Sequence, residues 1–150
     1  MREAIHAFKF NDRIDVGRAL ACMAGAGAVS ALRGAVDSIV PVPVTEKRLK
    51  ARGFNQSFII AEELSQLLGA PVDCETLIKV RQTADQYTLS KKDRKKNIKG
   101  AFSTTRRVAG LSFLVVDDLY TTGNTAQEAC RTLSAAGART IYFFALARTP

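Results

Sequence analysis

Residues 111–125, LSFLVVDDLYTTGNT, constrain the fold of this chain more than any other stretch. The first six residues are almost all apolar and include β-branched and aromatic types, which indicates a strand buried on both faces, as in a parallel sheet. Two carboxylates, Asp117 and Asp118, follow directly, and small hydroxylated residues then surround Gly123. The stretch therefore predicts a strand, a polar loop and the start of a helix.

A helix and a second strand are expected after this loop. Thr125 and Glu128 have the spacing of a capping box, and Gly137 stands where the helix would end. Residues 140–147 form a second strand-like run. The pattern is a βαβ unit whose loop lies at the carboxyl end of a strand, where open α/β sheets bind ligands. One helical face is expected to be buried through Ala126, Ala129, Cys130, Leu133 and Ala136.

The residue types of the loop favour an anion beside a polyol. Backbone N–H groups of residues 122–125, Asn124 included, would point out of a helix N-terminus, where the helix dipole favours negative charge. Gly123 would let the backbone approach closely, while Asp117 and Asp118 would repel the same anion and suit neutral hydroxyls or Mg²⁺. A ribose 5-phosphate offers both groups. The hydroxyls that would add donors to the phosphate belong to Thr121, Thr122 and Thr125.

The segment VVDDLYTTGNT resembles the phosphoribosyl pyrophosphate (PRPP) loop of type I phosphoribosyltransferases. The alternative is a buried strand with a solvated pair of aspartates, as in a receiver-type phosphoacceptor site. We disfavour that alternative because a receiver needs no threonine–glycine anion cradle directly after its acids.

Composition and charge bound the class of protein. The 150 residues, 47% of them hydrophobic, are enough for one domain with its own core, and no apolar run reaches the length of a membrane span. No signal-peptide pattern is present, and the three cysteines have no metal-ligand spacing, so a cytoplasmic protein is expected. His6 is the only histidine. The net charge of +8 is local, since residues 79–107 hold ten basic and two acidic side chains, and it predicts an anionic partner.

The remaining elements are expected in the following order. Asp12 or Asp15 would cap a helix over residues 16–28, and Asn55 would cap a second helix that Gly69 ends. Strands are expected at residues 36–40, 76–80 and 101–104, while residues 2–10 fit either a helix or a strand. Residues 45–56 are read as a solvated loop or, more sharply, as a pyrophosphate loop. Residues 81–100 form an irregular functional loop, with a short helix capped by Ser90 and running through Lys96.

Taken together, the motifs resemble those of the ComF family, a competence-associated group of phosphoribosyltransferase-like proteins. The matching blocks are PVPV at 41–44, RGFNQ at 52–56, RQTADQ at 81–86, RKKNIKGAF at 94–102 and the PRPP loop. The resemblance implies an α/β fold of the type I phosphoribosyltransferase kind. A mostly parallel central sheet of four or five strands would be flanked by helices and covered by a small hood, in a single domain over residues 1–150. The four-cysteine zinc module that often precedes this domain in the family is expected to be absent.

Two functions follow from the resemblance. The first is transfer of ribose 5-phosphate from PRPP to a nitrogen nucleophile, with Asp117 and Asp118 at the diol and Mg²⁺ between the diol and the pyrophosphate. Lys50 and Arg52 would hold one side of the pyrophosphate and Arg81 the other, and Val42 and Pro43 would complete the PRPP site. The second is a non-enzymatic competence factor that keeps the loop as a sensor of PRPP or a nucleotide and binds single-stranded DNA or protein partners through its basic segment.

Overall fold

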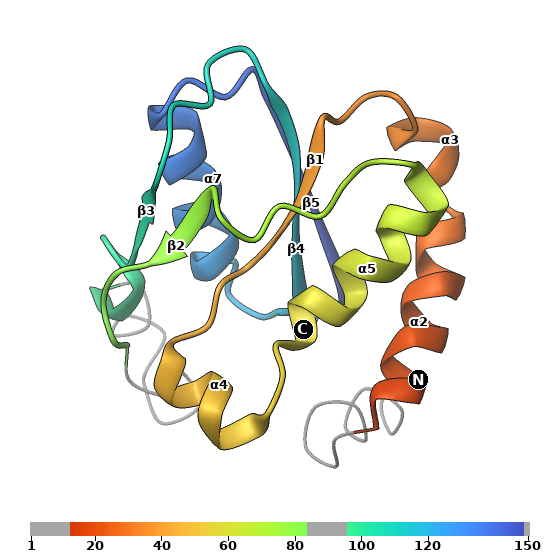
Figure 1. Cartoon of the computed structure of the whole chain (residues 1–150), viewed down its shortest axis with the longest axis horizontal. Helices are drawn as coiled ribbons and strands as arrows, with labels where there is room; N and C mark the ends of the chain where they lie inside the picture. The colour runs from red at the N-terminus through yellow and green to blue at the C-terminus, as the bar shows by residue number, and fades with distance from the viewer. Residues whose placement is uncertain (1–12, 84–95, 149–150) are drawn as a thin grey trace.

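A three-stranded parallel sheet forms the centre of the computed structural model, which describes residues 13–83 and 96–148. The strands β1 (Ser38–Pro41), β4 (Ser112–Tyr120) and β5 (Thr140–Arg148) lie in the order β1-β4-β5. In the register, Val40 pairs with Val115 and Val115 pairs with Phe143. The central strand β4 is the one that the apolar run predicted, and its residues 112–116 are all buried. Because all three strands are parallel, their carboxyl ends meet at one edge, at the bottom of Figure 1.

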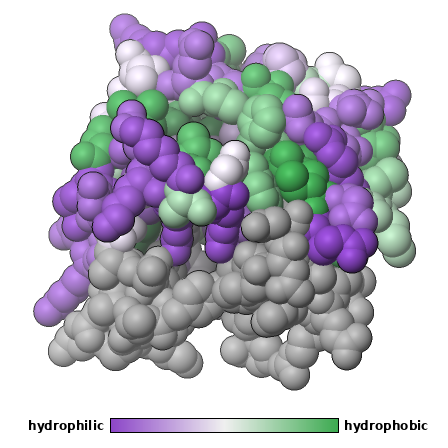
Figure 2. Space-filling model, turned by 60° about the horizontal axis from the view of Figure 1, so that its bottom comes forward, coloured by the Kyte–Doolittle hydropathy of each residue, from purple (hydrophilic) through white to green (hydrophobic). Residues whose placement is uncertain are grey.

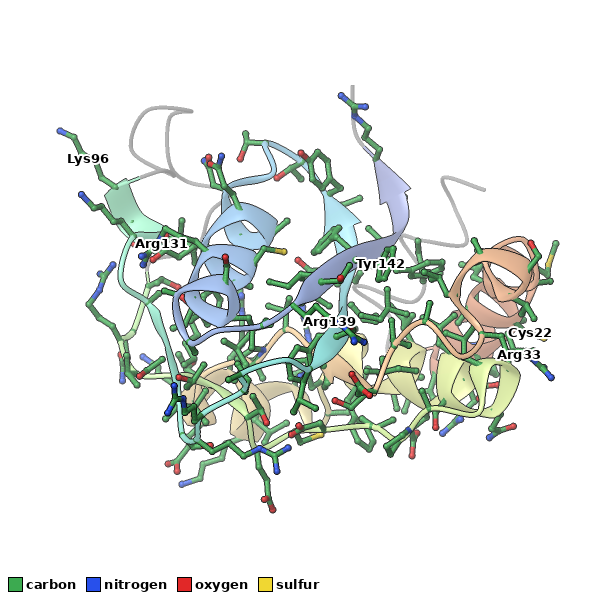
Figure 3. The ribbon with its side chains drawn as sticks, turned by 90° about the horizontal axis from the view of Figure 1, so that it is seen from above. Cys22, Arg33, Lys96, Arg131, Arg139 and Tyr142 are labelled. Atoms are coloured by element: carbon green, nitrogen blue, oxygen red, sulfur yellow. The ribbon has the colours of Figure 1, made fainter. Side chains whose placement is uncertain are left out.

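Helices cover both faces of this sheet (Figure 1). On one face lie α2 (Ile14–Ala26), α3 (Val29–Leu32) and α5 (Gln56–Leu68), and on the other lies α7 (Asn124–Ala135). Figure 3 shows the two layers from above, with Arg131 on the α7 side and Cys22 and Arg33 on the other. Each face has its own apolar cluster, one containing Leu114 and Val116 and the other Phe113 and Val115, as the alternation of side chains along β4 requires. The α/β fold with a parallel sheet flanked by helices is therefore confirmed.

The sheet has fewer strands than the four or five expected. The predicted strand at residues 76–80 forms β2 (Leu77–Lys79), which pairs antiparallel with β3 (Phe102–Thr104) in a separate hairpin beside α7. A fourth parallel strand is reduced to one bridge between Ile39 and Val72. The chain runs beside β1 only at Pro71 and Val72 and then turns at Asp73. The Asp73 carboxylate stabilises this turn by accepting hydrogen bonds from the backbone N–H groups of Glu75 and Thr76.

The predicted helix α5 has the expected ends. Asn55 accepts a hydrogen bond from the backbone N–H of Ser57, and Gly69 ends the helix in the left-handed conformation. Helix α2 packs closely on it, since a Cβ at Gly25 would lie 2.6 Å from a methyl group of Leu64. Gly25 therefore lies inside α2 and allows the close packing of α2 on α5.

Three local predictions were wrong. Thr125 and Glu128 form no capping box, because α7 begins at Asn124 after Gly123 and has no side-chain cap. Asp15 does not cap α2; it lies in the first turn and pairs with Arg13, which holds the N-cap position. Residues 45–56 are not simply a loop, because Glu46–Arg52 form the helix α4, capped by Thr45 and ended by left-handed Gly53.

Several predicted features lie outside the described residues: the segment 2–10, His6, Asp12 and most of the short helix capped by Ser90. Of the helices that the structure describes, none combines the length and the apolar character that crossing a membrane requires.

Candidate functional site

A cavity of about 140 Å³ opens at the carboxyl edge of the sheet. The turn after β1, the end of α4, the start of α5, the end of β4 with its loop, and the base of the β2–β3 hairpin all contribute to its wall. Figure 2 turns this edge forward and shows that hydrophilic groups dominate its described part, with smaller hydrophobic areas between them. The cavity lies at the edge where the sequence predicts a ligand, and it brings together residues as far apart in the chain as Val42 and Phe143.

The two acids line this cavity at the end of β4, and both are half-buried. Oδ1 of Asp117 accepts hydrogen bonds from Oγ of Ser57 at 3.1 Å and from the backbone N–H of Asp118 at 2.9 Å. Ser57 is only 4% exposed, so its hydroxyl belongs to the structural core of the site. The first turn of α5 thus fixes the orientation of Asp117, which is a condition for binding a diol in one geometry.

The threonine–glycine loop lines the same cavity through Thr121, Gly123 and Thr125. Gly123 has φ +76°, and α7 begins at the next residue, so the first turn of α7 borders this end of the cavity through Thr125 and Ala126. Oγ1 of Thr122 is buried and has no hydrogen-bond partner among the described residues. Neither Thr122 nor Asn124, both predicted as ligand-binding residues, is among the residues that line the cavity.

Tyr120 packs against the loop from the end of β4. A Cβ at Gly123 would lie 2.3 Å from the Tyr120 hydroxyl oxygen, so the ring rests on the glycine. The ring also makes an edge-to-face contact with Phe143, with centroids 5.9 Å apart, and the Arg148 guanidinium lies 5.7 Å from its centroid. Tyr120 and Phe143 both line the cavity.

The structure divides the other residues predicted for the PRPP site between two hollows. Val42, Pro43 and Arg52 line the cavity beside the acids. Lys50 and Arg81 line a second, neighbouring hollow between α4 and β2. Arg52 donates to Oε1 of Gln56 at 2.6 Å, whereas Arg81 donates to the backbone carbonyls of Asn97 and Lys99 at 2.7 and 2.8 Å.

Other residues of the site were not predicted as ligand-binding residues. Asn55 was predicted only as a helix cap, yet it lines the cavity and its Nδ2 donates to the Val42 carbonyl at 3.1 Å. Gln56 and Ser57 are buried polar residues at the start of a helix whose other buried residues are all apolar. The cations that complete the wall are Arg48 and Lys79, and Lys79 borders both hollows.

The donor set suits a metal ion only in combination with a ligand. Among the described residues there is no group of three or more histidine, cysteine or acidic side chains that could hold a metal ion. Asp117 and Asp118 supply oxygen donors of the kind that Mg²⁺ prefers, and the ion would complete its coordination with ligand oxygens and water. The residues therefore fit a Mg²⁺ that arrives with a phosphorylated ligand.

The phosphoribosyl transferase domain family matches residues 55–150 of this chain. The DNA utilization protein YhgH of Salmonella typhi is 38% identical over 149 residues, which cover 97% of this chain and 66% of that protein. Competence protein F of Haemophilus influenzae is 34% identical over 156 residues, which cover 96% of this chain and 66% of that protein. The chain thus spans just under two thirds of the length of these relatives.

The solved structure of a purine phosphoribosyltransferase from Pyrococcus horikoshii Ot3 shares the fold, with a TM-score of 0.54 and 17% identity over 85% of this chain and 73% of that one. The family match covers the acids, the threonine–glycine loop and the start of α5, whereas the turn after β1 and the helix α4, which also line the cavity, precede it. This chain therefore belongs to the phosphoribosyl transferase domain family and, within it, to the ComF-type proteins.

Proposed function

We propose that this chain binds PRPP in the cavity at the carboxyl edge and transfers its ribose 5-phosphate group to a nitrogen nucleophile. One observation carries the proposal: the paired acids and the threonine–glycine loop line one cavity, so a phosphate and a diol of the same sugar can be bound together. Had the loop been sealed in the core, or turned away from the acids, no single ribose phosphate would reach both.

Each part of the ligand has residues of matching chemistry. The 5-phosphate would accept hydrogen bonds from the backbone N–H groups at the start of α7 and from the hydroxyls of Thr121 and Thr125, which line the cavity. Asp117 and Asp118 would accept hydrogen bonds from the 2- and 3-hydroxyls. Mg²⁺, when bound, would neutralise charge on the pyrophosphate.

The pyrophosphate would lie toward the cationic wall of the cavity, which Arg48, Arg52 and Lys79 form. The bond from C1 to the pyrophosphate oxygen would break while the nucleophile's nitrogen forms the new bond to C1, so the leaving group gains negative charge that this wall stabilises. The apolar side chains of Val42 and Ile98 border the same space and would limit access of water to the cationic sugar.

Isothermal titration calorimetry with Mg-PRPP tests the proposal. Wild type is expected to bind, and the double variant Asp117→Asn/Asp118→Asn is expected to lose at least about tenfold in affinity, because two ionised acceptors are removed. Glu75→Gln is a matched control, since it removes one carboxylate from an exposed turn that does not line the cavity. Equal affinity of the wild type and the double variant, or no binding by either, would refute the proposal.

A second candidate function is binding of single-stranded DNA, which we consider because two relatives are named DNA utilization protein and competence protein. The observation that favours it is the second hollow, where Lys47, Lys50, Lys79 and Arg81 gather around a single acid, Glu46. Phosphate contacts of this kind would give an affinity that falls steeply with salt. In a salt titration with a labelled single strand, Lys47→Ala/Lys50→Ala should weaken binding while Asp117→Asn/Asp118→Asn should not. No affinity at low salt would exclude this candidate.

A further inference from the structure

Two side chains hold the short turn of residues 96–100, which closes one wall of the cavity. From β2's end, Arg81 donates from Nη2 to the carbonyl oxygens of Asn97 and Lys99. From α7, Glu128 accepts a hydrogen bond from the backbone N–H of Gly100 at 2.7 Å. One guanidinium nitrogen that donates to two carbonyls of the same turn restrains the backbone of that turn.

Glu128 binds the backbone N–H of Gly100 and does not cap its own helix. The residue is 7% exposed, and its carboxylate also accepts hydrogen bonds from the Arg131 guanidinium at 2.7 and 3.0 Å. Arg131 lies one turn further along α7, on the same side of the molecule as Lys96 (Figure 3). A nearly buried carboxylate with three hydrogen bonds is held in one orientation, so it can hold Gly100 in turn.

The residue that this arrangement positions is Ile98. It is 2% exposed, packs in the apolar cluster of the α7 face and lines the cavity. It lies between the two residues whose carbonyls Arg81 binds, and two residues before the amide that Glu128 binds. Neither Arg81 nor Glu128 lines the cavity itself. Arg81 and Glu128 can therefore affect ligand binding only indirectly, by fixing the backbone of residues 97–100.

We propose that Arg81 and Glu128 are positioning residues: by clamping residues 97–100 between β2 and α7, they fix the Ile98 wall of the ligand cavity. The expected effect on PRPP binding rests on the proposed function, whereas the clamp itself does not. It gives Arg81 a role different from the expected contact with pyrophosphate, because the guanidinium is engaged by two carbonyls. It also links α7, whose first turn forms the phosphate cradle, to the opposite wall of the cavity.

The first measurement is hydrogen exchange of the amides of residues 97–101 in the ligand-free protein, resolved by NMR. Glu128→Ala should speed exchange of the Gly100 amide by at least about tenfold, since it removes a hydrogen bond to a charged acceptor. Arg81→Ala should speed exchange across the same turn. Gln127→Ala and Arg107→Ala are the matched controls, because both side chains are exposed and neither touches the turn in any described contact. Unchanged exchange in both test variants would overturn the proposal.

The second measurement separates positioning from direct binding. Arg81→Lys keeps the positive charge on a shorter side chain, whose ammonium lies one bond nearer to the backbone than Nη2 and does not reach both carbonyls. Its affinity for Mg-PRPP should therefore fall by about as much as that of Arg81→Ala. If lysine restores wild-type affinity, or if Arg81→Ala loses affinity with unchanged exchange, then Arg81 contacts the ligand and the proposal is wrong. Gly25→Ala is the control for stability, because it should destabilise the α2–α5 contact, which is distant from the turn. This variant should keep the wild-type affinity for Mg-PRPP; a loss of affinity would show that lower stability alone weakens binding.

Failure of the proposed function gives a different result. If wild type binds no Mg-PRPP, transferase activity is refuted, while the exchange data still decide whether Arg81 and Glu128 clamp the turn.

Discussion

Substitution of Gly123 by alanine, which adds one methyl group, tests the geometry of the threonine–glycine loop. Its φ of +76° belongs to the left-handed region, and a Cβ there would lie 2.3 Å from the hydroxyl oxygen of Tyr120 and 2.6 Å from its Cζ. Tyr120 cannot simply rotate away at no cost, because its ring contacts Phe143 and lies near Arg148. Gly123→Ala must therefore strain the backbone and displace an aromatic ring.

Gly53 separates these two effects. It has nearly the same conformation, with φ +81°, and open space where a Cβ would be. Gly53→Ala should therefore destabilise the protein by the backbone cost alone, about 1–2 kcal/mol. Gly123→Ala adds the loss of the edge-to-face and cation–π contacts of Tyr120, which brings its cost to about 2–4 kcal/mol.

The assay is urea unfolding at equilibrium, followed by circular dichroism, in the wild-type and Tyr120→Ala backgrounds. In the wild-type background Gly123→Ala should cost clearly more than Gly53→Ala. In the Tyr120→Ala background the two substitutions should cost about the same, because the clash has been removed. Equal costs in the wild-type background would show that the Tyr120 ring does not rest on Gly123, and the reasoning would be refuted.

Three further outcomes are expected. Ser57→Ala should lower the free energy of unfolding by about 1 kcal/mol and weaken Mg-PRPP binding, because Asp117 loses a buried donor; unchanged calorimetric affinity would contradict this. Arg131 lowers the pKa of Glu128 below its usual 4.5, so ionised Glu128 stabilises the fold above that pH and this stability is lost as the pH falls; acid unfolding of Glu128→Gln should accordingly show a weaker pH dependence. Gly25→Ala should destabilise by about 1–3 kcal/mol through overpacking against α5, and a rise in stability in urea would show that the helices are not in close contact.

The central unit of the fold could be predicted because its signals are contiguous in the chain. The apolar run of β4, the two acids, the glycine-containing loop and the helix α7 follow each other within 25 residues, and each has a local pattern of its own. Local patterns also placed the ends of α5, since Asn55 and Gly69 act through neighbouring backbone groups. In these elements the short-range preference and the tertiary structure agree.

The errors have the opposite origin. Thr125 and Glu128 have the right spacing for a capping box, but Gly123 starts α7 early and Glu128 binds a backbone amide 28 residues away. The strand at residues 77–79 has an ordinary apolar pattern, which does not say whether its partner is β1 or β3. The spacing of residues in the sequence indicates only which contacts between neighbouring residues are possible. In both of these cases the structure forms a contact between distant segments instead.

The same distinction explains which parts of the site could be foreseen. The acids and the loop lie on one element, so their chemistry alone indicated a sugar phosphate. Ser57 reaches Asp117 across 60 residues, and only the packing of α5 on β4 makes that contact. Arg81 shows the consequence for function. As a cation near a predicted phosphate it is expected to bind the ligand, whereas in the structure its Nη2 donates to the carbonyls of Asn97 and Lys99 and its side chain does not line the cavity. Charge therefore predicts which residues an anion could attract, and hydrogen-bond partners decide which of them support the site from outside the cavity.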